Sequence, residues 1–151
     1  MASDTTPRTQ KLLAKSAALL VLIAMLTGFL VASAMTGQLH AEAGSLLAAH
    51  VNALAGSAWL VALGWSLPMT RFGEVGRKRM ALMVIFPCFA NWLVTAAKAF
   101  FFVKGVGADG NTANNVIFAL LGITVVVPSV AAAGVWVYSL FGTAASNAEG
   151  A

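Results

Sequence analysis

The sequence predicts an all-α integral membrane protein, a single domain built as a bundle of four transmembrane helices. Of its 151 residues, 60% are hydrophobic and only 9% are charged, whereas a soluble domain carries about 25% charged residues. The apolar residues form four long runs, and a helix needs about 20 of them to cross the hydrocarbon core. The runs lack the alternation of a membrane β-barrel, and an isolated segment satisfies its backbone groups in lipid only as a helix.

The four spans are expected near residues 16–36, 46–67, 80–103 and 115–141. The first run has no convincing cleavage site after it, so we expect a retained anchor rather than a signal peptide. Pro87 and Pro128 fall inside the third and fourth spans, where each removes a backbone donor and can kink its helix. The small, polar stretch after Phe141 is expected to be a frayed tail.

Basic residues predict the orientation. Seven of the nine Lys and Arg side chains form two groups, one before the first span and one between the second and third: Arg8, Lys11 and Lys15, then Arg71, Arg77, Lys78 and Arg79. Two crossings separate the groups, so both lie on one side. The positive-inside rule then places both termini in the cytoplasm, in a bacterial inner membrane. The basic groups are not interleaved with aromatic residues, which argues against nucleic acid as a partner.

Small residues recur every four positions in the first two spans. The first span has Ala24, Gly28 and Ala32, and the second has Ala49, Ala53 and Ser57. Such stripes let two helices approach closely. Packing inside the bundle and packing between subunits both explain them.

The third span carries polar residues on one face. Cys88, Asn91, Thr95 and Lys98 are spaced three, four and three apart, so they share a side of the helix. Polar groups at membrane depth are candidates for function. The alternatives are hydrogen bonds between helices for Asn91 and Thr95, and a snorkelling side chain for Lys98, five residues before the expected helix end.

His50 lies about one turn inside the second span. Ser57 shares its face, whereas Asn52 lies about 200° away around the helix. One histidine cannot form a protein zinc site, but it can be the single protein ligand of a haem iron. His40 is expected in a solvated loop, and the lone Cys88 is either a second candidate iron ligand or an apolar filler.

Two segments resemble a known family. "LLAAHVNALAGSAWLVALG" and "FANWLVTAA", from Leu46 to Lys98, resemble the hydroxylaminobenzene mutases and, more distantly, the styrene oxide isomerases. The resemblance implies a homotrimer that binds haem b, with His50 on the iron and Asn91 at the helix-three asparagine. Two positions depart from the pattern: Gly56 and Ser57 replace an Asn-Gly pair. Thr95 replaces a pocket tyrosine of the epoxide isomerases, which argues against epoxide isomerisation.

The resemblance leads us to expect an enzyme in which haem acts as a Lewis acid on the N–O bond of an arylhydroxylamine. A mutase would release an aminophenol, and a lyase would convert 4-hydroxylaminobenzoate to protocatechuate and ammonia. The expected catalytic residues are Asn91, Thr95 and Lys98, with Lys98 pairing with the substrate carboxylate or a haem propionate. The expected cofactor contacts are His50, Ser57 and Trp92, and Trp59 or Trp92 could stack on the ring.

Three other functions remain open. The chain could be a haem-binding electron-transfer or sensor subunit, although the spans offer no second histidine. It could be an epoxide isomerase. It could also be a structural membrane protein or transporter subunit, in which His50 and Lys98 would serve packing and snorkelling alone.

Overall fold

The computed structural model describes residues 6–141, and every regular element in this part is helical. α1 spans Thr6–Met35, α2 spans Ala43–Ser66 and α3 spans Glu74–Phe101, with a short 3-10 turn, η1, at Leu67–Met69. The fourth crossing consists of α4 (Thr112–Leu120), a π-helical segment η2 (Leu121–Val126) and α5 (Val127–Phe141). Four helices in the described part are long and apolar enough to cross a membrane, which confirms the predicted fold class. The expected tail after Phe141 lies outside the described residues.

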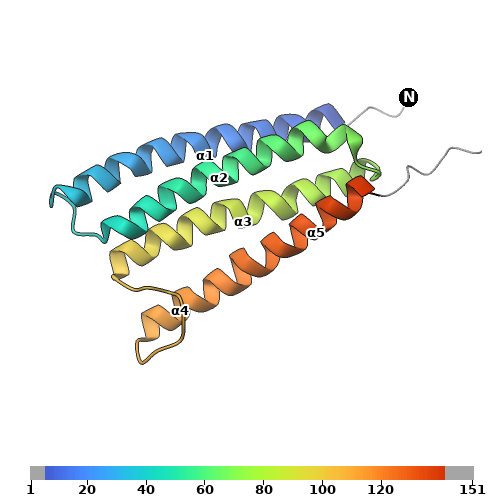
Figure 1. Ribbon diagram of the computed structural model, residues 1–151. Helices are drawn as coiled ribbons and strands as arrows, with labels where there is room; N and C mark the ends of the chain where they lie inside the picture. Colours follow the sequence, from blue (N-terminus) through green and yellow to red (C-terminus); the bar gives the residue numbers. More distant parts are fainter. Residues whose placement is uncertain (1–5, 142–151) are drawn as a thin grey trace, which may run out of the picture.

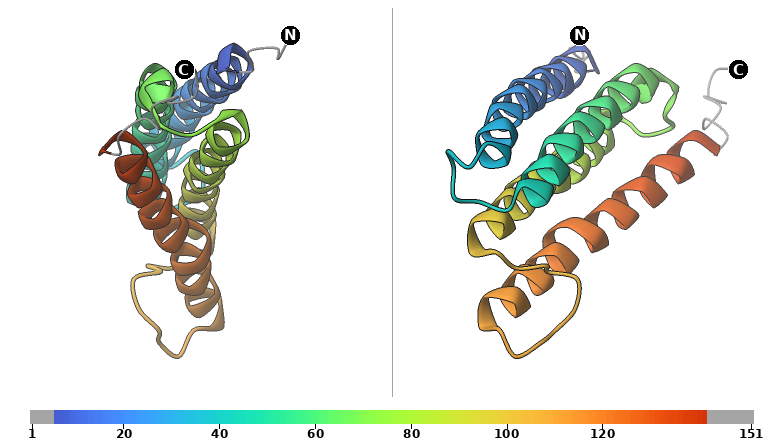
Figure 2. Two further views of the ribbon diagram at one scale, coloured as in Figure 1. Left: turned by 90° about the vertical axis from the view of Figure 1, so that its right-hand side faces the viewer. Right: turned by 60° about the vertical axis from the view of Figure 1, so that its left-hand side comes forward.

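Consecutive helices lie side by side and antiparallel (Figure 1). α1, α2 and α3 pack on one another, and the fourth helix packs mainly on α3 (Figure 2). Small side chains allow the close approach of α1 and α2: Ala24, Ala49 and Ala53 have no exposed surface. Ala32 is exposed. The small-residue stripes therefore serve mainly as internal packing.

The fourth helix is held at the terminal end of the bundle by polar contacts. The indole N–H of Trp136 donates to the Ser66 hydroxyl at 2.9 Å, and the backbone N–H of Arg71 donates to the Ser139 carbonyl at 3.1 Å. The Arg71 guanidinium lies 3.4 Å from the centre of the Tyr138 ring. These contacts join α5 to α2 and to the loop that precedes α3.

Pro128 has a visible effect on the backbone. The π-helical segment η2 ends two residues before it, and the Val127 N–H donates to the Gly122 carbonyl, five residues back. A proline ring clashes with the carbonyl four residues earlier, and a wider turn relieves that clash. Pro87, by contrast, is buried inside α3, which continues through it as one helix.

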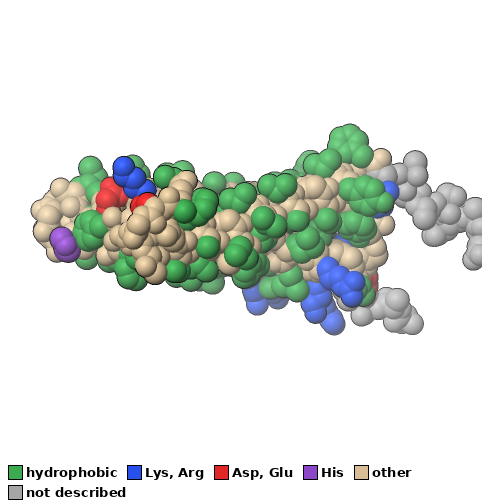
Figure 3. All heavy atoms as spheres, turned by 90° about the horizontal axis from the view of Figure 1, so that it is seen from below, with side chains coloured by type: hydrophobic (Ala, Val, Ile, Leu, Met, Phe, Trp, Pro, Cys, Tyr) green, Lys and Arg blue, Asp and Glu red, His purple; other side chains and the backbone are tan. Residues whose placement is uncertain are grey.

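Charged side chains gather at the two ends of the molecule, with an apolar middle (Figure 3). The start of α1 and the end of α5 lie at the same end (Figure 1), as an even number of crossings requires. At the opposite end, α3 stops at Phe101, two residues before the expected boundary at Val103. Lys98 therefore lies in the last turn of α3, closer to the helix end than the sequence suggested.

Candidate functional site

Three polar side chains from α2 and α3 form a closed hydrogen-bonded triangle inside the bundle. The Asn52 Nδ2 donates to Asn91 Oδ1 at 3.1 Å and to Thr95 Oγ1 at 3.2 Å. The Thr95 hydroxyl in turn donates to Asn91 Oδ1 at 3.3 Å. The two residues expected from α3 thus lie together. Asn52 joins them because its 200° offset from His50 turns it toward α3.

The triangle leaves two groups available for a ligand. An amide has one oxygen that accepts and one NH2 that donates two hydrogens. Both hydrogens of the Asn52 NH2 are engaged, so its Oδ1 is a remaining acceptor. The Asn91 Oδ1 accepts twice, so its Nδ2 is a remaining donor. Neither of these two atoms has a hydrogen-bond partner among residues 6–141.

These amides line a cavity between α2, α3 and α5. Its volume is about 140 Å³, and its wall also includes Ala55, Gly56, Trp59, Pro87, Cys88 and Ser129. An apolar protein cavity of about 150 Å³ accommodates one benzene ring. The cavity therefore matches a single aromatic ring, with Trp59 as an aromatic wall and the amides as polar contacts.

The structure explains why the expected amide is missing at position 56. A side chain built on Gly56 would place its Cβ 3.2 Å from Cys88 Cβ and 3.4 Å from Cys88 Sγ. The close packing of α2 on α3 thus leaves little room for a larger residue. Asn52 lies four residues earlier on the same face of α2 and lines the same cavity. Asn52 was not among the predicted site residues, because its position around the helix axis was compared only with that of His50.

His50 faces α1. Its Nδ1 lies 2.7 Å from the Ala24 carbonyl oxygen, which can only accept, so Nδ1 is the donor; in the neutral imidazole Nε2 then keeps its lone pair. Gly28 has no side chain to interfere, and a Cβ there would lie 3.5 Å from the imidazole. A backbone carbonyl that orients the imidazole in this way is the usual second partner of a metal-bound histidine. The half-buried imidazole therefore fits the role of a haem ligand through Nε2.

Trp92 of α3 contacts α1 at Thr27, three residues after the Ala24 carbonyl that bonds His50. Its indole N–H donates to the Thr27 hydroxyl at 3.0 Å, and Thr27 in turn bonds the Ile23 carbonyl. Trp92 also lines an apolar hollow of about 470 Å³ with Ile85, Phe86, Phe89, Ala90 and Leu93. Ser57, the third expected cofactor contact, is buried and donates to the Leu54 carbonyl at 2.7 Å within its own helix.

Within one chain, His50 and the amide triangle make contacts with different helices. His50 bonds to α1, and Asn52, two residues later, bonds to α3. His50 does not line the cavity that the amides share. The structure brings Asn91 and Thr95 together but does not add His50 to them.

Lys98 lies near the carboxylate of Glu42 at the outer end of the bundle. The loop before α2 folds onto α3, where the Glu42 N–H donates to the Ala99 carbonyl at 3.0 Å. Glu42 and Lys98 both line an outer pocket of about 480 Å³. The pKa of Glu42 is lowered, first by hydrogen bonding to Ser45, then by the Gly44 backbone N–H, and least by the positive charge of Lys98. Lys98 is thus separate from the amide cavity and shares its pocket with a carboxylate.

The other candidate ligands do not form a metal centre with His50. Among residues 6–141, no three His, Cys, Asp or Glu side chains lie close enough together to hold a metal ion. His40 is exposed and packs against the Phe102 ring at 4.7 Å, as expected for a loop residue. Cys88 is buried and directs its thiol toward the Gly56 carbonyl.

The fold and the cavity define a class: a multi-pass helical membrane protein with polar side chains gathered in an intramembrane cavity. The particular family follows from comparison with known proteins, because the styrene oxide isomerase family matches residues 9–141 of this chain. The chain therefore belongs to that family, an isomerase family. This match does not single out the hydroxylaminobenzene mutases, so the closer resemblance to them stays a prediction. Comparison with curated proteins gave no significant match, and comparison with solved structures gave none either.

Proposed function

We propose that this protein is a haem-dependent membrane isomerase that rearranges a small arylhydroxylamine to an aminophenol. The observation that carries the substrate is the pair of polar groups left over in the cavity wall. A hydroxylamine N–O–H unit both donates and accepts hydrogen bonds. The Asn52 oxygen and the Asn91 NH2 offer the matching acceptor and donor beside a space for one aromatic ring.

The proposed reaction conserves all atoms. The N–O bond breaks, a C–O bond forms on the ring, and the ring proton displaced there is balanced by a proton gained at nitrogen. Haem iron, when bound, supplies a Lewis acid that draws electron density from the oxygen. His50 would hold that iron through Nε2, while the Ala24 carbonyl keeps the imidazole oriented.

The chain's own residues then have distinct roles. The Asn91 NH2 donates to the oxygen as negative charge develops on it, which is the role of preorganised donors in many enzymes. The Asn52 oxygen accepts from the hydroxylamine N–H. Thr95 holds both amides in this orientation through its two bonds. The Trp59 face can stabilise positive charge on the ring.

A homotrimer is part of the proposal. His50 and the amide cavity lie on different sides of α2 in one chain, so an assembly could bring the His50 of one protomer to the cavity of the next. The apolar hollow around Trp92 supports this arrangement, since its volume of about 470 Å³ lies within the range of cofactor sites. The same hollow also suits a lipid chain. The haem content measured in the experiment below distinguishes these two occupants.

The lyase version receives less support from the structure. It rested on a buried Lys98 that needed the carboxylate of 4-hydroxylaminobenzoate as a partner. Lys98 instead lies in the last turn of α3, near Glu42 and outside the amide cavity. The mutase outcome needs no such contact.

Epoxide isomerisation is the second candidate, and the family match favours it. An epoxide oxygen only accepts hydrogen bonds, so it would use the Asn91 NH2 and leave the Asn52 oxygen without a partner. Burying an unpaired acceptor costs about 1–3 kcal/mol. Thr95 also stands where the epoxide isomerases have a tyrosine.

The test uses the detergent-purified full chain. A haem absorption band and conversion of phenylhydroxylamine to an aminophenol are the expected results. Styrene oxide, tested in parallel, should give little aldehyde. Conversion of styrene oxide but not of phenylhydroxylamine would show that the substrate is an epoxide rather than an arylhydroxylamine. A haem-loaded protein that converts neither substrate would favour an electron carrier.

A further inference from the structure

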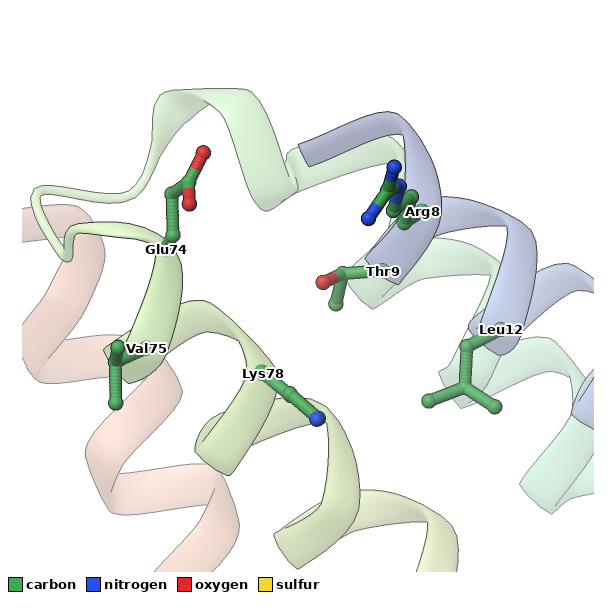
Figure 4. A pocket seen from close by; sticks show the side chains of 6 residues that line it. All are labelled: Arg8, Thr9, Leu12, Glu74, Val75 and Lys78. Carbon is green, nitrogen blue, oxygen red and sulfur yellow. The ribbon is translucent and has the colours of Figure 1, made fainter. Parts of the chain in front are cut away.

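A second pocket lies at the other end of the membrane span from the outer loops. It opens between the start of α1 and the start of α3 and has a volume of about 290 Å³. Its lining consists of Arg8, Thr9, Leu12, Glu74, Val75 and Lys78 (Figure 4). Lys78 precedes Asn91 by thirteen residues, or roughly 20 Å of helix at 1.5 Å per residue. The pocket is therefore separate from the amide cavity.

Cations from two different helices face this pocket. Lys78 extends from α3 toward α1, and Arg8 stands on the α1 side of the gap (Figure 4). Glu74 is the acidic residue of the lining, so the formal charge of the lining is +1. A single phosphodiester carries one negative charge and would balance it. An arginine guanidinium also matches the geometry of phosphate oxygens with paired N–H donors.

Apolar side chains complete the pocket. Leu12 is 36% exposed and Val75 is 65% exposed, and both belong to helices that cross the membrane. Leu12 lies on the membrane side of Arg8 along α1, whereas Val75 precedes the basic residues of α3. A ligand bound here would have its anionic group beside Arg8 and Lys78 and hydrocarbon beside Leu12. That combination is the chemistry of a phospholipid.

We propose that this pocket binds the headgroup phosphate of an anionic phospholipid such as phosphatidylglycerol. Basic pockets between transmembrane helices recognise anionic lipid headgroups. The lipid tails run along the outer faces of α1 and α3, and the headgroup joins the first and third helices at their terminal ends. This site goes beyond the proposed isomerase activity and does not depend on it.

The experiment measures retained lipid by native mass spectrometry of the purified full chain, with phosphatidylglycerol or phosphatidylcholine supplied. The test variant is Arg8→Gln with Lys78→Gln. The control variant is Lys11→Gln with Arg79→Gln, which removes two positive charges from the same two helices outside the pocket lining. Wild type and control should retain phosphatidylglycerol, whereas the test variant should bind it about 25-fold more weakly, at about five-fold per lost charge.

Three results would overturn the proposal. Equal loss of lipid from both variants would show a general effect of surface charge. Equal retention of phosphatidylcholine and phosphatidylglycerol would show no recognition of the anion. Displacement of the retained lipid by inorganic phosphate at low millimolar concentration would assign the pocket to a free anion.

Discussion

Replacing Asn91 with leucine separates the catalytic role of its amide from its structural role. The change removes two hydrogen bonds, from Asn52 at 3.1 Å and from Thr95 at 3.3 Å, and leaves the bond between Asn52 and Thr95 intact. Polar contacts between membrane helices contribute about 0.6 kcal/mol each on average. One of the two bonds joins α2 to α3 and the other lies within α3, so we expect the free energy of unfolding to fall by about 0.6–1.2 kcal/mol.

The expected effect on catalysis is much larger. If the Asn91 NH2 donates to the reacting oxygen, its loss should lower kcat/KM by about 10²–10³-fold, as removal of a preorganised donor does elsewhere. The assay is conversion of phenylhydroxylamine by purified protein, with the fraction of folded protein and the haem content measured on the same samples.

Thr95→Val is the matched control. Valine has nearly the shape of threonine, and the change also removes two of the three bonds of the triangle. The stability loss should thus be similar, at about 0.6–1.2 kcal/mol. The Asn91 donor remains, so kcat/KM should fall less than about ten-fold. Equal losses of activity in the two variants would refute a direct role of Asn91 and assign the triangle to structure alone.

The remaining predictions concern the two ends of the bundle and the haem. His50→Ala should abolish both the haem band and activity, because the variant lacks the Nε2 atom that would bind the iron. His40→Ala should preserve both. A haem band that survives in His50→Ala would contradict the ligand assignment. A reporter fused to the C-terminus should be active in the cytoplasm, and a periplasmic signal would reverse the orientation. Lys98→Met should leave turnover of phenylhydroxylamine unchanged, and a selective loss with 4-hydroxylaminobenzoate would restore the lyase assignment. Glu42 has a pKa below its ordinary value of 4.5. Its carboxylate therefore stabilises the fold above that pH, and the contribution is lost as the pH falls through the lowered pKa. Glu42→Gln should remove this acid dependence from thermal unfolding curves, and an unchanged acid dependence would rule Glu42 out as its source.

Composition and periodicity were sufficient to predict the membrane class and the four crossings. The length of an apolar run measures directly whether a helix can cross the hydrocarbon core, so no tertiary information is needed. The shared face of Asn91 and Thr95 was also predictable, because residues four apart on a helix must lie on one side. The ends were less accurate: α1 begins at Thr6, ten residues before the expected span, and α3 ends at Phe101. The polar residues before the first apolar run extend α1, whereas α3 ends where Phe102 adopts a left-handed backbone conformation, with φ 52°.

Only the tertiary structure decided which helix each polar residue meets. Periodicity gives the direction of a side chain around its own axis but not the identity of the neighbour on that side. For this reason His50 and Asn52, two residues apart, could not be assigned to α1 and α3 from the sequence. The neighbour of Lys98 was undetermined for the same reason. The composition of a loop does not show whether the loop folds toward the bundle or away from it. The backbone bond from Glu42 to Ala99 settles that direction. It places a carboxylate near the lysine.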